Sequence, residues 1–145
     1  MFGRKRVKPI EVTSLDDLKP LLAEGKPVLL DFWQPGCRNC KIMDGIVNEL
    51  AEEYGGSAHV VKVDVTRVAG AAASFSVKAT PTFLLMGRPA APAAKKKAKR
   101  REAPPPAAAA VHPVARWRAS GMVLKDQMTR ALESAGAVRS DQAPG

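Results

Sequence analysis

The two cysteines of the chain lie two residues apart, and this spacing makes them the first candidates for chemistry. Cys37 and Cys40 are separated by Arg38 and Asn39. Two cysteines in 145 residues do not make a disulfide framework, and a bond across so short a loop cross-links no distant parts of a fold. The spacing instead suits thiol-disulfide exchange, in which one thiolate attacks a disulfide and a second thiol resolves the mixed disulfide. We interpret the pair as a redox centre.

A strand before the cysteines and a helix after them are predicted to position the pair. Residues 28–33 are a nearly continuous apolar run, typical of a central strand covered on both faces. From Cys40 onward, apolar residues recur at helical spacing until Gly55. The helix dipole and the free backbone N–H groups would favour a thiolate at Cys37, whereas Cys40 lies one turn further in. We therefore expect Cys37 to attack and Cys40 to resolve.

Asp31 is the one acid inside the apolar run. An ionised carboxylate is costly in such a strand, so we expect the pKa of Asp31 to be raised, as suits a base that deprotonates Cys40. Lys62, in the next predicted strand, is its candidate partner. The alternative is a solvated acid at a strand end, and the pattern leaves both interpretations open.

The remaining pattern predicts an α/β fold. Strands are expected at 10–13, 28–33, 60–65, 80–86 and 114–119, and helices at 15–22, 40–54, 68–75 and 123–132. Ser14 and Asp17 resemble a capping box for the first helix, which Gly25 ends. The order predicts a central mixed sheet of about five strands, flanked by helices on both faces.

Residues 88–113 consist almost wholly of alanine, proline, lysine and arginine, and cannot form a core. This segment carries +6 of the net charge of +9, because it has seven cations and one anion. We predict a disordered insertion in a hairpin between the last two strands. The mildly basic remainder does not favour a nucleic-acid surface over the whole molecule. Residues 95–101 are either a solvated linker or a contact for an anionic partner.

The N-terminal residues 1–9 are basic, but no continuous apolar segment of a signal peptide follows them. The best candidates for a membrane span, at 28–33 and 83–86, have the length of strands and are too short to cross a bilayer. We therefore expect no transmembrane segment and a reducing, cytoplasmic location.

Four motifs in separate parts of the chain share their order and spacing with one known family. They are residues 31–33 followed by 37–41, residues 62–64, residues 75–82, and Gly121 followed by 125–128. Together they resemble the thioredoxin family. The resemblance implies a thioredoxin-like domain over 10–135, interrupted by the insertion at 88–113. A basic arm at 1–9 precedes this domain, and a flexible tail at 136–145 follows it.

The resemblance also implies an activity. The family's members are protein-disulfide oxidoreductases, so we expect catalytic roles for Cys37, Cys40, Asp31 and Lys62. The expected partners are protein disulfide substrates and a thioredoxin-reductase-like electron donor. We expect a monomer whose redox group is the Cys37–Cys40 disulfide itself, with no bound cofactor or metal.

The resemblance places substrate binding at Thr80, Pro81 and Gly121. A cis bond before Pro81 would leave the backbone of Thr80 free to pair with an extended substrate. Without the resemblance, Pro81 is merely a proline at the start of a strand.

Several positions near the cysteines depart from the family pattern, and these departures predict a changed reduction potential and a changed choice of partner. Gly36 stands where the family usually has tryptophan, Arg38 and Asn39 replace the usual Gly-Pro, and Gly45 replaces a helix proline. The cation at Arg38 favours a thiolate, so we expect a more oxidising couple than in a relative with uncharged residues there. Trp33 is either a packing residue or part of the site.

Two other functions remain open from the sequence. One is a non-catalytic adaptor with the thioredoxin-like scaffold, which contacts an anionic partner through the basic insertion. The other is a carrier that shares Cys37 and Cys40 across a zinc-bound dimer, since one chain does not supply four suitably spaced ligands. His59 and His112 are interpreted as incidental.

Overall fold

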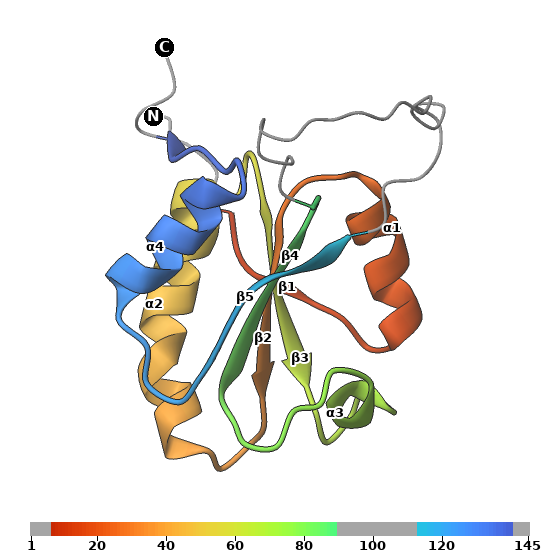
Figure 1. The fold of residues 1–145 in the computed structure, drawn as a ribbon. Coiled ribbons are helices and arrows are strands. Elements are labelled where there is room, and N and C mark those ends of the chain that lie inside the picture. Colours follow the sequence, from red (N-terminus) through yellow and green to blue (C-terminus); the bar gives the residue numbers. More distant parts are fainter. Residues whose placement is uncertain (1–6, 90–112, 141–145) are drawn as a thin grey trace, which may run out of the picture.

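Five strands form one sheet in the part of the chain that the structure describes (Figure 1). The structure is a computed structural model that describes residues 7–89 and 113–140. The strands are β1 (Ile10–Glu11), β2 (Val28–Trp33), β3 (His59–Asp64), β4 (Thr82–Gly87) and β5 (Val114–Ser120). The helices are the 3-10 helix η1 (Leu15–Asp17), α1 (Leu18–Ala23), α2 (Arg38–Tyr54), α3 (Ala71–Ser74) and α4 (Lys125–Ser134).

The sheet is mixed, and its strand order is β1-β3-β2-β4-β5. β1 and β2 run parallel to β3, whereas β4 runs antiparallel to both β2 and β5. β2 lies in the middle and is buried from Val28 to Phe32, as its apolar composition predicts. The predicted α/β fold with a five-stranded mixed sheet is confirmed.

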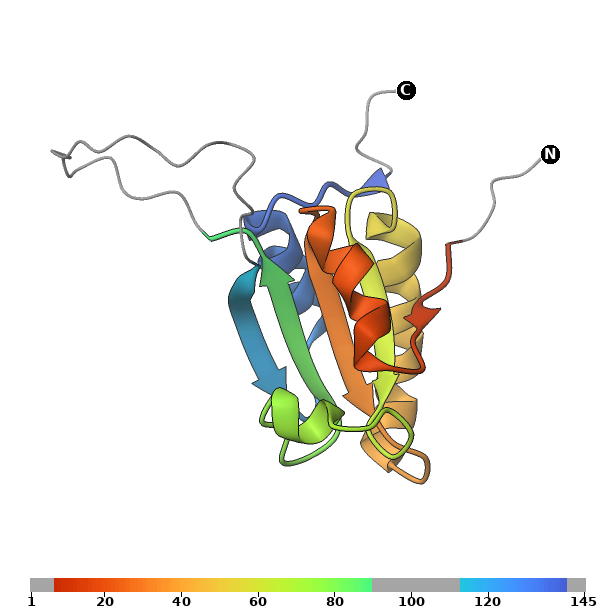
Figure 2. The same cartoon turned by 90° about the vertical axis from the view of Figure 1, so that its right-hand side faces the viewer.

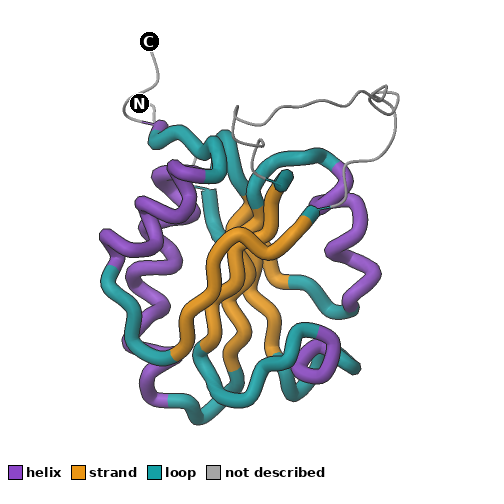
Figure 3. The backbone as a smooth tube through the Cα atoms, in the orientation of Figure 1, coloured by secondary structure: helices purple, strands orange, loops and turns teal. Residues whose placement is uncertain are grey.

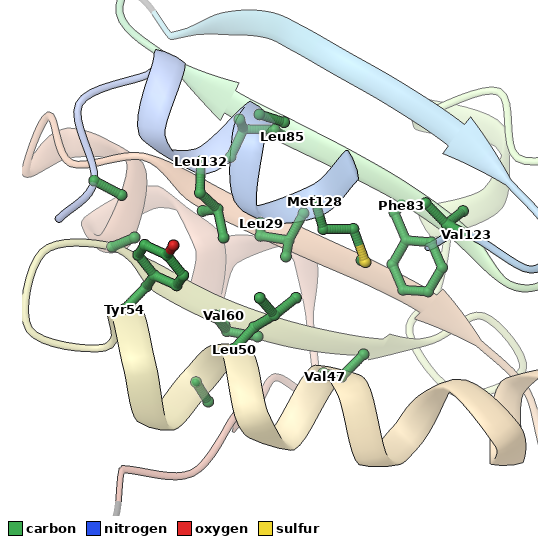
Figure 4. Packing of buried hydrophobic residues seen from close by; sticks show 14 of the residues in the cluster. Leu29, Val47, Leu50, Tyr54, Val60, Phe83, Leu85, Val123, Met128 and Leu132 are labelled. Carbon is green, nitrogen blue, oxygen red and sulfur yellow. The ribbon is translucent and has the colours of Figure 1, made fainter. Parts of the chain in front are cut away.

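Helices cover both faces of the sheet, with α2 and α4 on one side and α1 and α3 on the other (Figures 1, 2 and 3). Side chains of β2 enter two cores, because successive residues of a strand point to opposite faces. Leu29 packs in the core beneath α2 and α4, and Leu30 and Phe32 pack in the other core. Figure 4 shows the first core, where Leu50 of α2 and Met128 of α4 surround Leu29.

The first helical segment begins and ends where the sequence predicts. The Asp17 carboxylate accepts hydrogen bonds from the backbone N–H of Thr13 at 2.9 Å and of Ser14 at 3.2 Å. The segment is divided into η1 and α1, and it ends before Gly25, whose φ of +82° is left-handed.

Two helices differ from the prediction at their ends. α3 covers four residues where the pattern predicts a helix over 68–75, because Gly70 adopts φ +79° and interrupts the right-handed backbone. The pattern also places Leu124 in the last helix. It instead precedes α4 with an extended backbone and is 70% exposed, so helical periodicity does not apply to it.

The packed part of the chain extends beyond the predicted boundary at residue 135. Ala137 is 5% exposed and belongs to the core beneath α2 and α4. The backbone N–H of Val138 donates to the Ser57 hydroxyl at 2.8 Å, and this hydroxyl donates to the Val138 carbonyl at 3.0 Å. The prediction of a flexible tail from residue 136 was therefore wrong for Ala137 and Val138. One buried alanine and one pair of hydrogen bonds leave no recognisable pattern in the sequence.

β4 and β5 form the predicted antiparallel hairpin. Gly87 pairs with Val114 and Thr82 pairs with Ser120, with an irregularity in register near Leu85. The two ends of the connection at 88–113 are thus neighbours in the sheet. The predicted insertion itself lies mostly outside the described residues, which stop at residue 89 and resume at residue 113.

Candidate active site

The two cysteines form a disulfide at the N-terminus of α2. Cys37 is the residue that caps the helix, and its Sγ accepts a hydrogen bond from the backbone N–H of Cys40 at 3.1 Å. Cys37 is half-buried, whereas Cys40, one turn into the helix, is 4% exposed. The two sulfurs therefore differ in access from outside, as predicted from their positions.

Gly36, one of the departures from the family pattern, lies in the turn before the helix. Gly36 has φ +83° and is exposed, a backbone conformation that glycine adopts without steric cost. The turn closes with a hydrogen bond from the N–H of Cys37 to the carbonyl of Gln34 at 3.3 Å. Arg38 and Asn39, the first two residues of α2, are exposed beside the disulfide.

Asp31 is buried in the centre of the sheet. It is 2% exposed, and its Oδ1 has no hydrogen-bond partner within the described residues. Burial raises the pKa of Asp31 to about 7, the nearby Lys62 ammonium opposes this rise, and the Asp44 carboxylate adds to it. The interpretation of Asp31 as a solvated acid was therefore wrong, and the expectation of a raised pKa holds.

Lys62 is the neighbour of Asp31 across β2 and β3, but its ion pair is with another residue. Asp31 and Lys62 are partners in the parallel register. The Lys62 Nζ donates to Asp44 Oδ1 on α2 at 3.0 Å and lies 4.9 Å from the centre of the Trp33 ring. The predicted partnership with Asp31 is therefore electrostatic, since the direct contact goes to Asp44. Trp33 is half-buried, and its ring faces the Lys62 ammonium.

Asp44 is a site residue that the sequence reasoning missed. It lies four residues after Cys40, so both residues occupy the same side of α2. An acid at that helical position, beside a buried cysteine, was the available signal. It carried little weight because acids on long helices are usually solvated.

Pro81 follows a cis peptide bond from Thr80, as the resemblance implies. The bond lies just before β4, which begins at Thr82 and not at residue 80. Thr82 is paired with Phe32, so Pro81 is next to the carboxyl end of β2, from which the cysteine turn leaves. The N–H of Gly121 donates to the Pro81 carbonyl at 2.8 Å. The three residues predicted to bind substrate are therefore close together.

A second residue outside the prediction supports this loop from β5. The Arg118 guanidinium donates to the carbonyls of Phe75 at 2.7 Å and Ser76 at 2.6 Å. Ser76 has a φ of +56°, which is uncommon for a residue with a side chain. Thr82 donates from its hydroxyl to the Ala79 carbonyl at 2.7 Å. These bonds hold the segment that leads to Pro81.

The described residues contain no group of three or more histidine, cysteine or acidic side chains arranged to hold a metal ion. The His59 ring contacts Glu24 Oε1 at 2.9 Å, and His112 lies outside the residues that the structure describes. None of the described helices is long and apolar enough to cross a membrane.

Comparison with known proteins identifies the family. The family model for thioredoxin matches residues 10–103 of the chain, which is more than half of its length. The chain belongs to the thioredoxin family. Its five-stranded sheet, its cysteine pair at the start of α2 and its cis-proline before β4 are the thioredoxin elements described above.

Several relatives are similar over part of the chain. Thioredoxin of Haemophilus influenzae is 42% identical over 60 residues, which cover 41% of this chain and 56% of that protein. The M-type chloroplast thioredoxin of Spinacia oleracea is 33% identical over 79 residues, which cover 54% and 44%. Thioredoxin of Pyropia yezoensis is 33% identical over 75 residues, which cover 52% and 70%. The chain thus matches about half the length of the first two relatives.

Solved thioredoxin structures share the fold at lower sequence identity. A mutant thioredoxin from Halobacterium salinarum superimposes with a TM-score of 0.66 at 22% identity, covering 92% of this chain and 96% of that one. Thioredoxin of Malassezia sympodialis has a TM-score of 0.68 at 18% identity, covering 93% and 96%.

Proposed function

We propose that this thioredoxin-family chain is a protein-disulfide oxidoreductase that works through Cys37 and Cys40. The observation that carries the proposal is the unequal access of the paired sulfurs at the start of α2. Cys37 is half-buried at the helix cap, and Cys40 is buried behind it. One accessible nucleophile and one protected resolving thiol are what two-step exchange requires.

In the reducing direction, the Cys37 thiolate attacks one sulfur of a substrate disulfide. The substrate S–S bond breaks, a mixed disulfide forms with Cys37, and the first substrate thiolate leaves. Cys40 then loses its proton, and its thiolate attacks the Cys37 sulfur. The Cys37–Cys40 disulfide forms, the second substrate thiolate leaves, and two electrons have passed to the substrate.

Asp31 is the proposed base for the second step. Its carboxyl group is buried, and its pKa of about 7 allows it to accept a proton near neutral pH. Cys40, the thiol that must be deprotonated, is buried as well, so bulk water has little access to it. Lys62 influences Asp31 through its charge from the neighbouring strand.

The proposed substrate is an extended polypeptide beside Pro81. Thr80 and Pro81 lie beside the cysteine end of the sheet, where an extended segment can pair with the main chain of Thr80 in the manner of an added strand. Gly121 borders the same place through its hydrogen bond to Pro81. Gly36 adds no side chain there, which leaves room for bulky partners.

The proposal also covers the electron donor, the redox group, the oligomeric state and the location of the protein. Electrons come from a thioredoxin-reductase-like donor, the disulfide itself is the redox group, and the protein works as a monomer in the cytoplasm. The family's use of protein substrates supports the choice of partner. Separately, residues 95–101 are proposed to contact an anionic partner. This segment lies outside the residues that the structure describes, so its charge alone supports that part of the proposal.

Trapping of mixed disulfides tests the proposal. Cys40→Ser removes the resolving thiol, so Cys37 should accumulate disulfide-linked protein partners that dithiothreitol releases. The control is the double variant Cys37→Ser/Cys40→Ser, which should trap none. In parallel, the unmodified chain should accelerate reduction of a protein disulfide by dithiothreitol. No trapped partners and no acceleration would overturn the proposal and favour the adaptor.

A further inference from the structure

Asp44 lies beside the proposed redox site without belonging to the motifs that define it. It stands on α2 and is half-buried, with a side chain that is 42% exposed. Its carboxylate forms an ion pair with the Lys62 ammonium at 3.0 Å. The side chain of Lys62 is 13% exposed, and Asp31 behind it is 2% exposed. The three charged side chains therefore run from the interior of the sheet toward solvent.

The strand pattern places these groups on one face of the sheet. Leu29 of β2 and Val60 of β3 pack in the core beneath α2 and α4. Asp31 and Lys62 lie two residues further along the same strands, so their side chains point to that face too. Asp44 approaches from α2, which covers the face (Figure 1). Lys62 thus has two carboxyl groups within reach of its charge, and its direct contact is with Asp44.

We propose that Asp44 is a positioning residue for the proton transfer between Cys40 and Asp31. By holding the Lys62 ammonium in an ion pair with α2, it leaves the Asp31 carboxyl group without an ion pair. An acid that is tightly paired with a lysine is a weak base, because the cation stabilises its ionised form. The inference rests on the proposed oxidoreductase function, which supplies the proton-transfer step.

The ionisation of Asp31 depends on the charged groups on the elements around it. From β3 comes Lys62, which favours the ionised carboxyl group, and from α2 comes Asp44, which disfavours it. The neighbour on β4 is the uncharged Phe83. Glu11 of β1 is the register partner of Lys62 on its other side. Loss of the Asp44 charge would remove a like charge near Asp31 and free Lys62 to approach it, and both changes make Asp31 more acidic.

Lys62 is reached by a groove that lies between α2 and residues 7–11. The groove has a volume of about 530 Å³ and is lined by Gly45, Glu49 and Lys62, among others. A Cβ at Gly45 would have no heavy atom within 4 Å, so this surface of the helix is open. Lys62 therefore lines this open groove while its charge also acts on the buried Asp31 carboxyl group, which suits a group that transmits a surface charge inward.

Titration of Asp31 by carboxyl carbon NMR tests the proposal on the full, oxidised chain. Asp44→Asn should lower the pKa of Asp31 by about one unit, since a nearby cation lowers the pKa of a carboxylic acid by about one to three units. Asp44→Ala should do the same, and Asp44→Glu should restore the pKa toward that of the unmodified chain. Asp126→Asn on α4 is the control, because it removes an exposed, ion-paired acid that is not among the charges acting on Asp31, and it should leave the pKa of Asp31 unchanged.

The pH profile of disulfide reduction supplies the kinetic readout. Its midpoint should move to lower pH in Asp44→Asn by the same amount as the NMR pKa. An Asp31 titration that Asp44→Asn and Asp44→Ala leave unchanged would overturn the inference, whatever the activity. An inactive unmodified chain would overturn the proposed function instead, because the NMR titration does not depend on turnover.

Discussion

Among individual residues, Asp31 has the largest consequence for how stability depends on pH. Its carboxyl group is 2% exposed and has a pKa of about 7 in the folded protein. In the unfolded chain, its pKa returns to an ordinary value near 3.8. The folded state therefore binds this proton more tightly than the unfolded chain. The contribution of Asp31 to the free energy of unfolding should be highest below about pH 4, fall up to about pH 7, and stay constant above it.

Asp31→Asn removes this dependence while keeping the size of the side chain. At pH 8 the variant should be more stable than the unmodified chain by about 4 kcal/mol, from about three pKa units at about 1.4 kcal/mol each. At pH 3.5 the two should be nearly equal. Urea unfolding at both values measures the difference, with the exposed Asp126→Asn as the control. An equal difference at both pH values would contradict the assignment.

Arg38 is the residue beside the cysteines whose charge departs most from the family pattern. It is the first residue of α2 and is exposed. A cation there stabilises the Cys37 thiolate together with the helix dipole. Stabilisation of the thiolate favours the reduced form, so the couple becomes more oxidising.

The reduction potential should therefore lie above about −270 mV, the reference value for thioredoxin. Arg38→Gln should lower it by about 10 to 20 mV, the size expected for one exposed charge. Equilibration with glutathione buffers measures both values. Arg130→Gln on α4 is the matched control and should leave the potential unchanged. A potential at or below the reference in the unmodified chain would contradict the expectation.

Among the elements, α2 links the site to the core. Its N-terminus carries the disulfide, and its buried side packs Met43, Val47 and Leu50 against the sheet. The position where the family usually has proline is Gly45, which lies in the interior of this helix and is exposed. Glycine there lowers helix stability without serving a left-handed turn.

Gly45→Ala should stabilise the protein by about 0.5 to 1 kcal/mol, because the added methyl group meets no neighbour and the unfolded chain loses freedom. Gly136→Ala is the matched comparison. That glycine also has open space around it, but its φ is +103°. The same methyl group should therefore destabilise the protein there by about 1 kcal/mol or more. Changes of the same sign in urea unfolding would contradict this reasoning.

In the molecule as a whole, the sheet separates two cores and presents the site at one end. The cysteine turn follows the carboxyl end of β2, and Pro81 adjoins it from β4. The connection between β4 and β5 leaves from Gly87, which follows Met86, and Met86 faces Val28 at the opposite end of β2. The insertion is therefore attached at the far end of the sheet from the proposed chemistry.

Deletion of residues 90–112 should therefore leave disulfide reduction unchanged. Arg88, Pro89 and Pro113 would then connect the paired ends Gly87 and Val114. Shortening the connection from 26 to three residues should add about 2 kcal/mol to the free energy of unfolding by ideal loop closure. Activity and urea unfolding of the deletion variant measure both effects. A loss of activity in a folded deletion variant would show that the insertion takes part in catalysis.

Local sequence was sufficient for most of the fold and for the identity of the reactive groups. The apolar run with Asp31 predicted a buried central strand, and the spacing of Cys37 and Cys40 before a periodic helix predicted their unequal access. Both signals are short-range, because strand burial and helix periodicity repeat within a few residues. The resemblance added the cis bond at Pro81, which the composition around it does not reveal.

The charge pairing around Asp31 depended on contacts between distant parts of the chain. Lys62 lies next to Asp31 in the sheet, but its ammonium contacts Asp44. This pairing forms only when β2, β3 and α2 have packed together. The support of the Pro81 loop by Arg118 from β5 depends on packing in the same way. The chemistry of the cysteines was thus readable from neighbouring residues, whereas the charges that tune it follow from packing, because Coulomb interactions depend on distance in space.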